Sequence, residues 1–364
     1  MRHHAPNLLN PPAMSAQPAF DAIRYPFGET TPALGESIEL APGLRWLRMG
    51  LPFALNHINL WLLEDTLDGV RGWTIVDCGI DSPPTRAAWE QVFATQLCGL
   101  PVLRVVVTHM HPDHVGLAHW LTARWNCLLW MSATDYAVSC MAARGCMTIG
   151  GEAMAAHYAA QGLADPQTLA AIRKRTDYYS GLVPAMPTRF VRLQDGDVLR
   201  IGERDWRCVA GYGHAPEHIS LYSEADALFI AGDMLLPRIS TNISVNDNEP
   251  LSNPLQQFLD SLARFSALLS DDTLIFPSHG LPFRGALARI AQLQQHHHER
   301  LAEVMQACAT PQTAADLLPV LFKRPLDVHQ ITFAMGESIA HLHKLWFDGQ
   351  LRRLEDGGVY RFVR

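Results

Sequence analysis

The chain has 364 residues, of which 48% are hydrophobic and 18% are charged, and its formal net charge at pH 7 is −7. This length predicts a main domain with a smaller domain beside it. The acidic balance disfavours a generally cationic surface of the kind that binds nucleic acid through its phosphates. The first twenty residues do not read as a signal peptide, and no apolar run is long enough to span a membrane, so we expect a cytoplasmic protein without a membrane partner. The seven cysteines are scattered and never spaced as CxxC, which predicts free thiols.

The amino-terminal two thirds of the sequence predict an arm and then an α/β domain. Residues 1–35 contain repeated prolines without a hydrophobic period and are predicted to form an extended arm. Residues 36–285 are predicted to be the main domain, because short hydrophobic strands at 44–49, 58–64 and 73–79 precede a helix at 83–97. A buried strand, a helix and another strand follow. This alternation favours an α/β sandwich with covered sheets.

Residues 133–180 differ in composition from the rest of the main domain. They are rich in Ala, Met and Tyr, with glycines as interruptions, which predicts two or three helices inserted between strands. Such an insertion is placed to act as a lid. Strands resume after it, at 188–193, 197–202, 205–211, 219–224 and 227–233, and a helix at 254–269 and a strand at 273–279 complete the domain.

Residues 286–364 change to a helical pattern. Amphipathic stretches at 286–308, 310–322 and 331–351 are followed by two β-like runs around Asp356, Gly357 and Gly358, a hairpin signal. Three helices and a hairpin predict a winged-helix-like domain. The three histidines at 296–298 are predicted to lie on a solvated helix face, because consecutive helical residues point in different directions.

The stretch VVVTHMHPDHVG, residues 105–116, places metal-ligand side chains at the end of a predicted buried strand. His109 and His111 alternate in an extended segment, so both imidazoles can face one ion. Asp113 and His114 lie where the chain turns into a helix and project toward a neighbouring position. The spacing therefore favours two adjacent ions.

Two ions need further ligands from elsewhere in the fold. His214, Asp233 and His279 each follow a hydrophobic strand and stand near Gly or Ser. A tight turn at such a position lets the side chain face a shared cleft. These three residues are the candidates to complete the site.

The segments THMHPDHVG, GHAPEH, AGDM and PSHG together resemble the metallo-β-lactamase superfamily over residues 40–285. The resemblance implies a four-layer αββα sandwich with the metals at one edge of two packed sheets. It implies that the first ion is bound by His109, His111 and His214, the second by Asp113, His114 and His279, and that Asp233 bridges both. Asp113 and Asp233 are also the implied catalytic carboxylates, and Asp77, in IVDCG, is the implied partner behind the ligands.

These ligand types fix the expected chemistry. Imidazole and carboxylate suit two divalent ions, with zinc preferred over iron or manganese. A water shared by two ions ionises near neutral pH. We therefore predict a metal-bridging hydroxide that attacks an ester, thioester or lactone carbonyl of a small molecule. By chain order, the candidate substrate contacts are Tyr178, Tyr179, Arg238, Thr241 and Asn242.

Two other functions stay open at this point. The tail and the phrase GDMLLPRISTNISV resemble the β-lactamase-like protein 2 group, some of whose members cut single-stranded RNA, although residues 320–364 carry only seven basic against five acidic residues. A mononuclear iron persulfide dioxygenase would leave Asp113, His114 and His279 without a second metal. A glutathione substrate is disfavoured, because Lys323, Arg324 and Lys344 are the only suitably placed cations. The tail is expected to pack on the main domain or on a partner subunit, which leaves a homodimer open.

Overall fold

The computed structural model describes residues 22–53, 55–147 and 150–364. Residues 1–21 of the predicted arm lie outside them. The rest of the arm runs over the main domain, where Arg24 pairs with Arg284 through two backbone hydrogen bonds. None of the described helices combines the length and the apolar character that a membrane crossing needs.

Seven strands form the first sheet in chain order. They are β1 (Ile38–Ala41), β2 (Leu44–Gly50), β3 (His57–Leu67), β4 (Val70–Val76), β5 (Val102–Val106), β6 (Leu128–Ser132) and β7 (Phe190–Leu193). Pairing is antiparallel from β1 to β4 and parallel from β4 to β7. The parallel strands require crossovers, and the helices α1 (Pro83–Thr95) and α3 (Ala118–Trp125) supply the first two. Strand β1 is the one strand of this sheet that the sequence pattern did not indicate.

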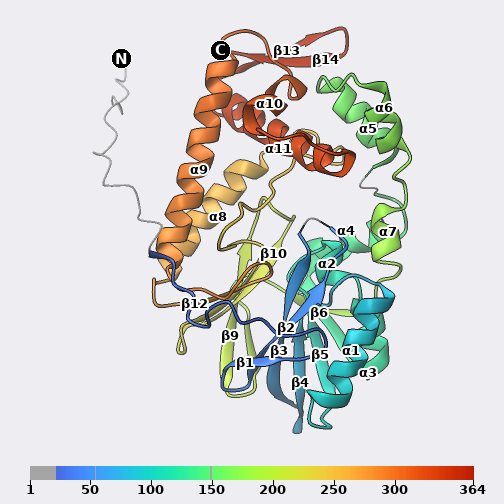
Figure 1. The fold of residues 1–364 in the computed structure, drawn as a ribbon, viewed down its shortest axis with the longest axis vertical. Coiled ribbons are helices and arrows are strands. Elements are labelled where there is room, and N and C mark those ends of the chain that lie inside the picture. The colour runs from blue at the N-terminus through green and yellow to red at the C-terminus, as the bar shows by residue number, and fades with distance from the viewer. Residues whose placement is uncertain (1–21, 54, 148–149) are drawn as a thin grey trace, which may run out of the picture.

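A second sheet of five strands packs against the first. Its order is β12-β11-β10-β9-β8, with β8 (Val198–Ile201), β9 (Arg204–Gly211), β10 (His218–Ser223), β11 (Leu228–Gly232) and β12 (Leu274–Pro277). Every residue of β10, β11 and β12 is buried, because α8 (Pro254–Leu268) and the C-terminal helices cover the sheet's outer face. Figure 1 shows the two sheets side by side below the helical part of the molecule.

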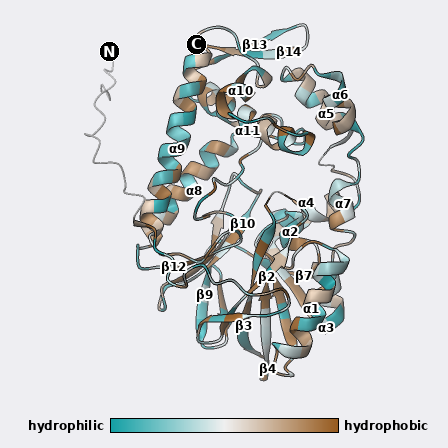
Figure 2. Cartoon of the chain, viewed as in Figure 1, coloured by the Kyte–Doolittle hydropathy of each residue, from teal (hydrophilic) through white to brown (hydrophobic). Residues whose placement is uncertain are grey.

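Three hydrophobic clusters separate the layers and confirm the αββα sandwich. The cluster between the sheets joins Trp46 and Trp61 of the first sheet to Trp206 and Phe276 of the second. A second cluster lies between the first sheet and the helices α1 and α3, and a third lies between the second sheet and α8. The strands are accordingly mostly hydrophobic in Figure 2.

The insertion is helical, as predicted, but contains four helices among the described residues where two or three were expected. They are α4 (Ala133–Ala143), α5 (Gly151–Ala160), α6 (Pro166–Arg173) and α7 (Tyr178–Leu182). Helices α5 and α6 pack on one another, and α6 also contacts the C-terminal helix α11 (Val328–Phe347). The insertion therefore reaches from the first sheet to the C-terminal unit (Figure 1).

The C-terminal unit has the predicted order of three helices and a hairpin. It consists of α9 (Ala286–Ala307), α10 (Leu318–Leu321), α11, β13 (Arg352–Asp356) and β14 (Val359–Val363). Helix α11 begins with a capping box in which the Asp327 side chain accepts from the Gln330 N–H and the Gln330 side chain accepts from the Asp327 N–H. The winged-helix assignment stays a prediction.

The prediction of a solvated face for the three consecutive histidines was wrong for one of them. His297 is fully buried, with its Nδ1 3.4 Å from Nε2 of His341 and its ring edge-on to Phe258. Helix α9 is covered by both α8 and α11, so its apolar stripe is wider than a helix covered on one side would need.

Candidate metal centre

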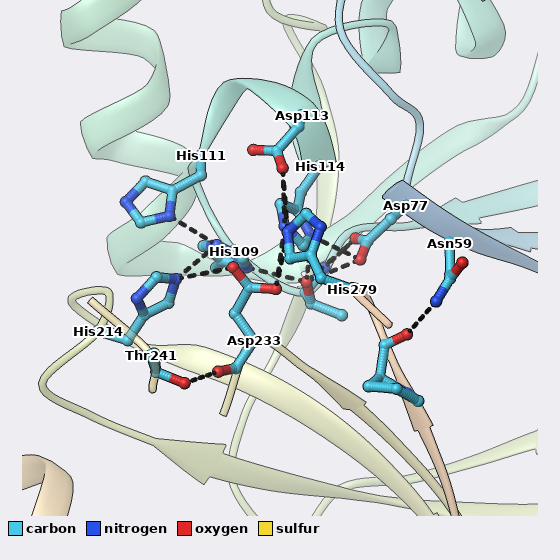
Figure 3. Close-up of polar contacts among 12 residues, drawn as sticks. Asn59, Asp77, His109, His111, Asp113, His114, His214, Asp233, Thr241 and His279 are labelled. Carbon is cyan, nitrogen blue, oxygen red and sulfur yellow. Dashed lines mark hydrogen bonds and ion pairs between the residues drawn. The ribbon is translucent and has the colours of Figure 1, made fainter. Parts of the chain in front are cut away.

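The seven predicted ligands come together at one edge of the sandwich, where four strands end (Figure 3). His109 and His111 follow β5, His214 follows β9, Asp233 directly follows β11 and His279 follows β12. The short helix α2 (Pro112–Val115) carries Asp113 and His114, and its first residue is a proline, which fits the first helical turn. The extended backbone of His111 just before α2 turns its imidazole back toward His109.

The ligand atoms form two groups, each within 4.8 Å. The first holds His109, His111, His214 and Asp233, and the second holds Asp113, His114 and His279. In the first group, His109 Nε2 lies 2.9 Å from His111 Nδ1 and 3.2 Å from His214 Nε2. In the second group, Asp113 Oδ2 lies 3.7 Å from His114 Nε2 and 3.4 Å from His279 Nε2.

Asp233 lies between the two groups. Its Oδ2 is 3.3 Å from Nε2 of His214, and its Oδ1 is 3.5 Å from Nε2 of His114 and 3.4 Å from Nε2 of His279. One carboxylate oxygen thus faces each group. This is the placement that the predicted bridging role requires.

Three of the imidazoles have their tautomer fixed by a partner behind the ring. Nδ1 of His114 donates to Asp77 at 2.8 Å, Nδ1 of His214 to the carbonyl of Asn242 at 2.8 Å, and Nδ1 of His279 to the carbonyl of His57 at 2.7 Å. Each bond holds a proton on Nδ1, so Nε2 is the ring nitrogen that faces the site. Partners of this kind orient metal ligands and raise their basicity.

Asp77, the predicted partner behind the ligands, is fully buried and has a left-handed backbone, with φ of 63°. This conformation is uncommon outside glycine, and aspartate tolerates it better than most residues. The turn directs the carboxylate to His114 and to Thr108, whose N–H and hydroxyl both donate to it. The segment that carries the first ligands is thereby attached to the end of β4.

A buried carboxylate that the sequence analysis did not single out clamps two ligand loops together. Asp135, in the first turn of α4, accepts from the backbone N–H of Met110 at 2.8 Å and of Glu217 at 2.6 Å. Burial raises its pKa to about 6. The hydroxyl of Tyr179 donates to the carbonyl of Met110 from the other side, at 2.5 Å.

The histidines of the site differ in the direction of their pKa shifts. Burial alone would lower the pKa of His279, but Asp233 and Asp113 raise it to about 10. Burial would also lower the pKa of His114, yet Asp77 and Asp113 hold it well above its usual range. In contrast, burial brings the pKa of His111 down to about 3. The site thus contains an imidazole that is neutral and can bind a cation directly, together with imidazoles whose protons a cation would replace.

Two buried atoms show that these residues fit metal ions. His114 Nε2 and Asp233 Oδ1 make no hydrogen bond among the described residues, although they face one another at 3.5 Å. A buried polar atom without a partner costs roughly 1–3 kcal/mol, and more when it is charged. Both atoms point into the space between the two groups. Bound divalent cations would satisfy them, and nitrogen and carboxylate oxygen are suitable donors for such ions.

A cavity of about 420 Å³ opens beside His111 and His214. Its apolar wall comes from the insertion, its polar wall from the loop that follows Asp233, and part of its outer rim from α11. No Lys or Arg occurs among the described residues that line it. The lining includes Val138, Met147, Met154, Asn242, Asp247, Glu249, Thr332 and Phe333.

The five predicted substrate contacts have different surroundings. Asn242 lines the cavity, and Tyr178 is near Asp113, whose charge helps burial raise the tyrosine pKa to about 12. Tyr179 is buried and donates to the carbonyl of Met110, and Thr241 donates to the carbonyl of Asp233 at 2.5 Å. Both therefore support the backbone of the site and do not line the cavity. Arg238 is exposed and lies over the Tyr25 ring, outside the cavity.

Comparisons with known proteins agree with this arrangement. A family model described as the metallo-beta-lactamase superfamily matches residues 55–279, and a model of the metallo-beta-lactamase-like C-terminal domain matches residues 301–364. Among curated proteins, the probable metallo-hydrolase YqjP of Bacillus subtilis (strain 168) is 23% identical over 343 residues, which cover 87% of this chain and 96% of YqjP.

Two solved structures resemble most of the chain. A beta-lactamase domain protein from Burkholderia ambifaria is 54% identical, with a TM-score of 0.89 over 95% of this chain and 99% of that one. The metallo-beta-lactamase family protein TTHA1429 from Thermus thermophilus is 28% identical, with a TM-score of 0.76 over 90% and 100% of the two chains. The C-terminal unit is therefore shared with these proteins together with the sandwich.

Proposed function

Because the chain belongs to the metallo-β-lactamase superfamily and is a hydrolase of that fold, we propose that it binds two zinc ions and hydrolyses an ester, thioester or lactone of a small molecule. The observation that carries the proposal is the position of Asp233, with one carboxylate oxygen toward each of two ligand groups. When bound, the two ions supply a hydroxide at neutral pH and polarise the carbonyl.

The residues of the chain bind and orient the reacting groups. Asp233 supplies negative charge to both ligand groups, and His114, His214 and His279 present Nε2 because a partner holds Nδ1. Asp113 is the more exposed of the two carboxylates, at 18% against 10% for Asp233. We assign Asp113, as the more accessible of the two carboxylates, the proton that the attacking water gives up.

The cavity supports a small and uncharged or cationic substrate. Its volume of about 420 Å³ is in the range of small-molecule sites. Asp247 and Glu249 on its polar wall form no ion pair within the described residues, and burial raises the pKa of Asp247. An anionic group beside these carboxylates would be repelled. The surroundings thus disfavour glutathione thioesters and RNA as substrates.

The test is hydrolysis of a panel that contains a neutral aryl ester, a thioester and a lactone, by protein reconstituted with zinc. Asp233→Asn is expected to lower kcat/KM by more than about 100-fold, since changes behind metal ligands already cost about 10–100-fold. The matched control is Asp226→Asn at an exposed position that pairs with Arg204. Full activity of Asp233→Asn would contradict the proposed mechanism.

Metal analysis of the purified protein separates hydrolysis from the dioxygenase alternative. The proposal expects close to two zinc ions per chain, because each of the two groups offers at least three possible ligands. A single iron per chain, with no turnover of the panel, would overturn it. Manganese or iron at two per chain, with turnover, would keep the reaction and change the metal.

A further inference from the structure

Helix α11 of the C-terminal unit holds the loop that follows Asp233. The backbone N–H of Val245 donates to the carbonyl of Gly336 at 3.1 Å. A side chain at Gly336 would collide with this loop, because its Cβ would lie 2.5 Å from Ser244 Oγ and 2.6 Å from Ser244 Cβ. The next residue, Glu337, has the side chain of Asn242 beside its carboxyl, where burial raises the pKa of Glu337 to about 7 and Asn242 opposes that rise. Two adjacent helical residues thus fix three positions of the loop.

The same loop holds two of the metal ligands. Thr241 donates through its hydroxyl to the carbonyl of Asp233 at 2.5 Å, and the carbonyl of Asn242 accepts from Nδ1 of His214 at 2.8 Å. Both acceptors are backbone atoms, so the position of the ligands depends on the path of the loop.

Asn242 transmits the position of the helix to the imidazole. Its Oδ1 accepts from the Ser244 hydroxyl at 2.8 Å, which leaves the amide NH₂ free to face the Glu337 carboxyl. With its side chain held at both ends, the residue has little freedom to rotate its carbonyl. Metal sites need such support, because ligands must be held within about 0.5 Å and 10–20° of the productive geometry.

We propose that Gly336 and Glu337 are positioning residues of the metal centre, which act on His214 and Asp233 through residues 241–245. The C-terminal unit then helps to position the metal ligands, and its loss would weaken metal binding even where the sandwich stays folded. The inference rests on the proposed function only for its activity readout, since metal affinity can be measured without a substrate.

The experiment compares single variants of α11 in the full chain. Glu337→Ala removes the partner of Asn242, and Glu337→Gln keeps an acceptor of the same shape. Gly336→Ala adds the colliding Cβ while raising helix propensity, so it weakens the site without weakening the helix. Ser338→Ala is the matched control, because Ser338 is buried on the same helix and donates at 2.7 Å to Ala314, away from the loop.

Zinc affinity is measured by competition with a chelator, and the ligand environment by the visible spectrum of the cobalt-substituted protein. We expect Glu337→Ala to lose about 3–10-fold in affinity at one of the two sites and Gly336→Ala about 10-fold or more, near the range for partners behind ligands. Both should alter the cobalt spectrum and lower kcat more than they change KM. Glu337→Gln and Ser338→Ala should bind like the unmodified protein.

A compensating pair keeps the test decisive if a variant folds poorly. Ser244→Gly removes the atoms that the Gly336→Ala side chain meets at 2.5 and 2.6 Å, but also the hydroxyl that donates to Asn242. The double variant should therefore match Ser244→Gly alone in affinity and spectrum, because Gly336→Ala has nothing left to collide with. Unchanged affinity and spectrum in both Glu337→Ala and Gly336→Ala would overturn the inference. Reduced affinity in a protein that hydrolyses none of the panel would support the inference and refute the proposed function.

Discussion

The opposite protonation of the two ligand groups predicts that their metal ions load with different pH dependence. His279, with a pKa of about 10, and His114, with its pKa well above the usual range, are protonated at neutral pH. An ion that binds these two residues must displace two protons. In the other group, burial lowers the pKa of His109 and brings that of His111 to about 3, so these ligands hold no proton to displace.

The magnitude follows from linkage between proton and metal binding. Displacing two protons makes the affinity of the Asp113, His114 and His279 group rise by about 100-fold per pH unit while both histidines are protonated. The other group, in which burial keeps His109 and His111 neutral, gains far less over the same range. Zinc added to chelator-treated protein should therefore fill one site per chain near pH 6 and two sites near pH 8.5.

Calorimetry checks the proton count directly. Titrations at one pH in buffers with different ionisation enthalpies give the protons released with each equivalent of zinc, and the second equivalent should release about two more than the first. Ionisation of bound water adds to the total number of protons released. The expected difference between the two equivalents comes from the histidine ligands. Equal proton release in the two steps, or filling of both sites at pH 6, would refute the assignment of charges within the site.

Three further substitutions test the support around the site. Asp77→Asn should weaken zinc binding by about 10–100-fold at the group that contains His114, measured by chelator competition, because it removes the charge behind that imidazole. Asp135 has a folded pKa of about 6, above the unfolded value, so its contribution to stability is present below pH 4 and is lost as pH rises through 6. The unfolding free energy of the unmodified protein, relative to Asp135→Asn, should thus fall by up to about 3 kcal/mol between pH 4 and pH 7, and a flat difference would contradict the burial of this charge. Asp65→Ala should lower the urea midpoint by an amount equivalent to about 3–5 kcal/mol without changing zinc content, because Arg104 is 3% exposed and would lose its carboxylate partner at 2.8 Å.

The sequence was sufficient for features whose signal is local. His109 and His111 alternate in a strand end, and Asp113 and His114 follow in the turn, so spacing alone indicates a shared site. His214, Asp233 and His279 needed the resemblance to a family as well, because nothing in their local sequence states that three distant strand ends meet. The structure brings all seven together, and their roles as ligands stay a prediction until metal is measured.

Features that depend on tertiary contacts could not be predicted in this way. Asp135 has no motif around it, and its role arises because α4 starts beside two ligand loops. Chain order placed Tyr179 and Arg238 near the cleft but could not give the direction of their side chains. The prediction failed for His297 because helical periodicity shows which residues share a face, and does not show how many neighbours cover the helix.

The position of α11 also bears on the RNA alternative. A helix that reads nucleic acid must present an exposed face, whereas α11 is buried over most of its length against α8, α9 and α10. Two cations of the tail are engaged within the chain as well, since Arg353 lies over the rings of Trp346 and Tyr360 and Arg361 pairs with Asp316 at 3.9 Å. Phosphate binding would have to break these contacts before it gained any new ones. The hydrogen bonds of α11 to the loop behind His214 point instead to a unit that supports the metal centre and forms part of the rim of its cavity.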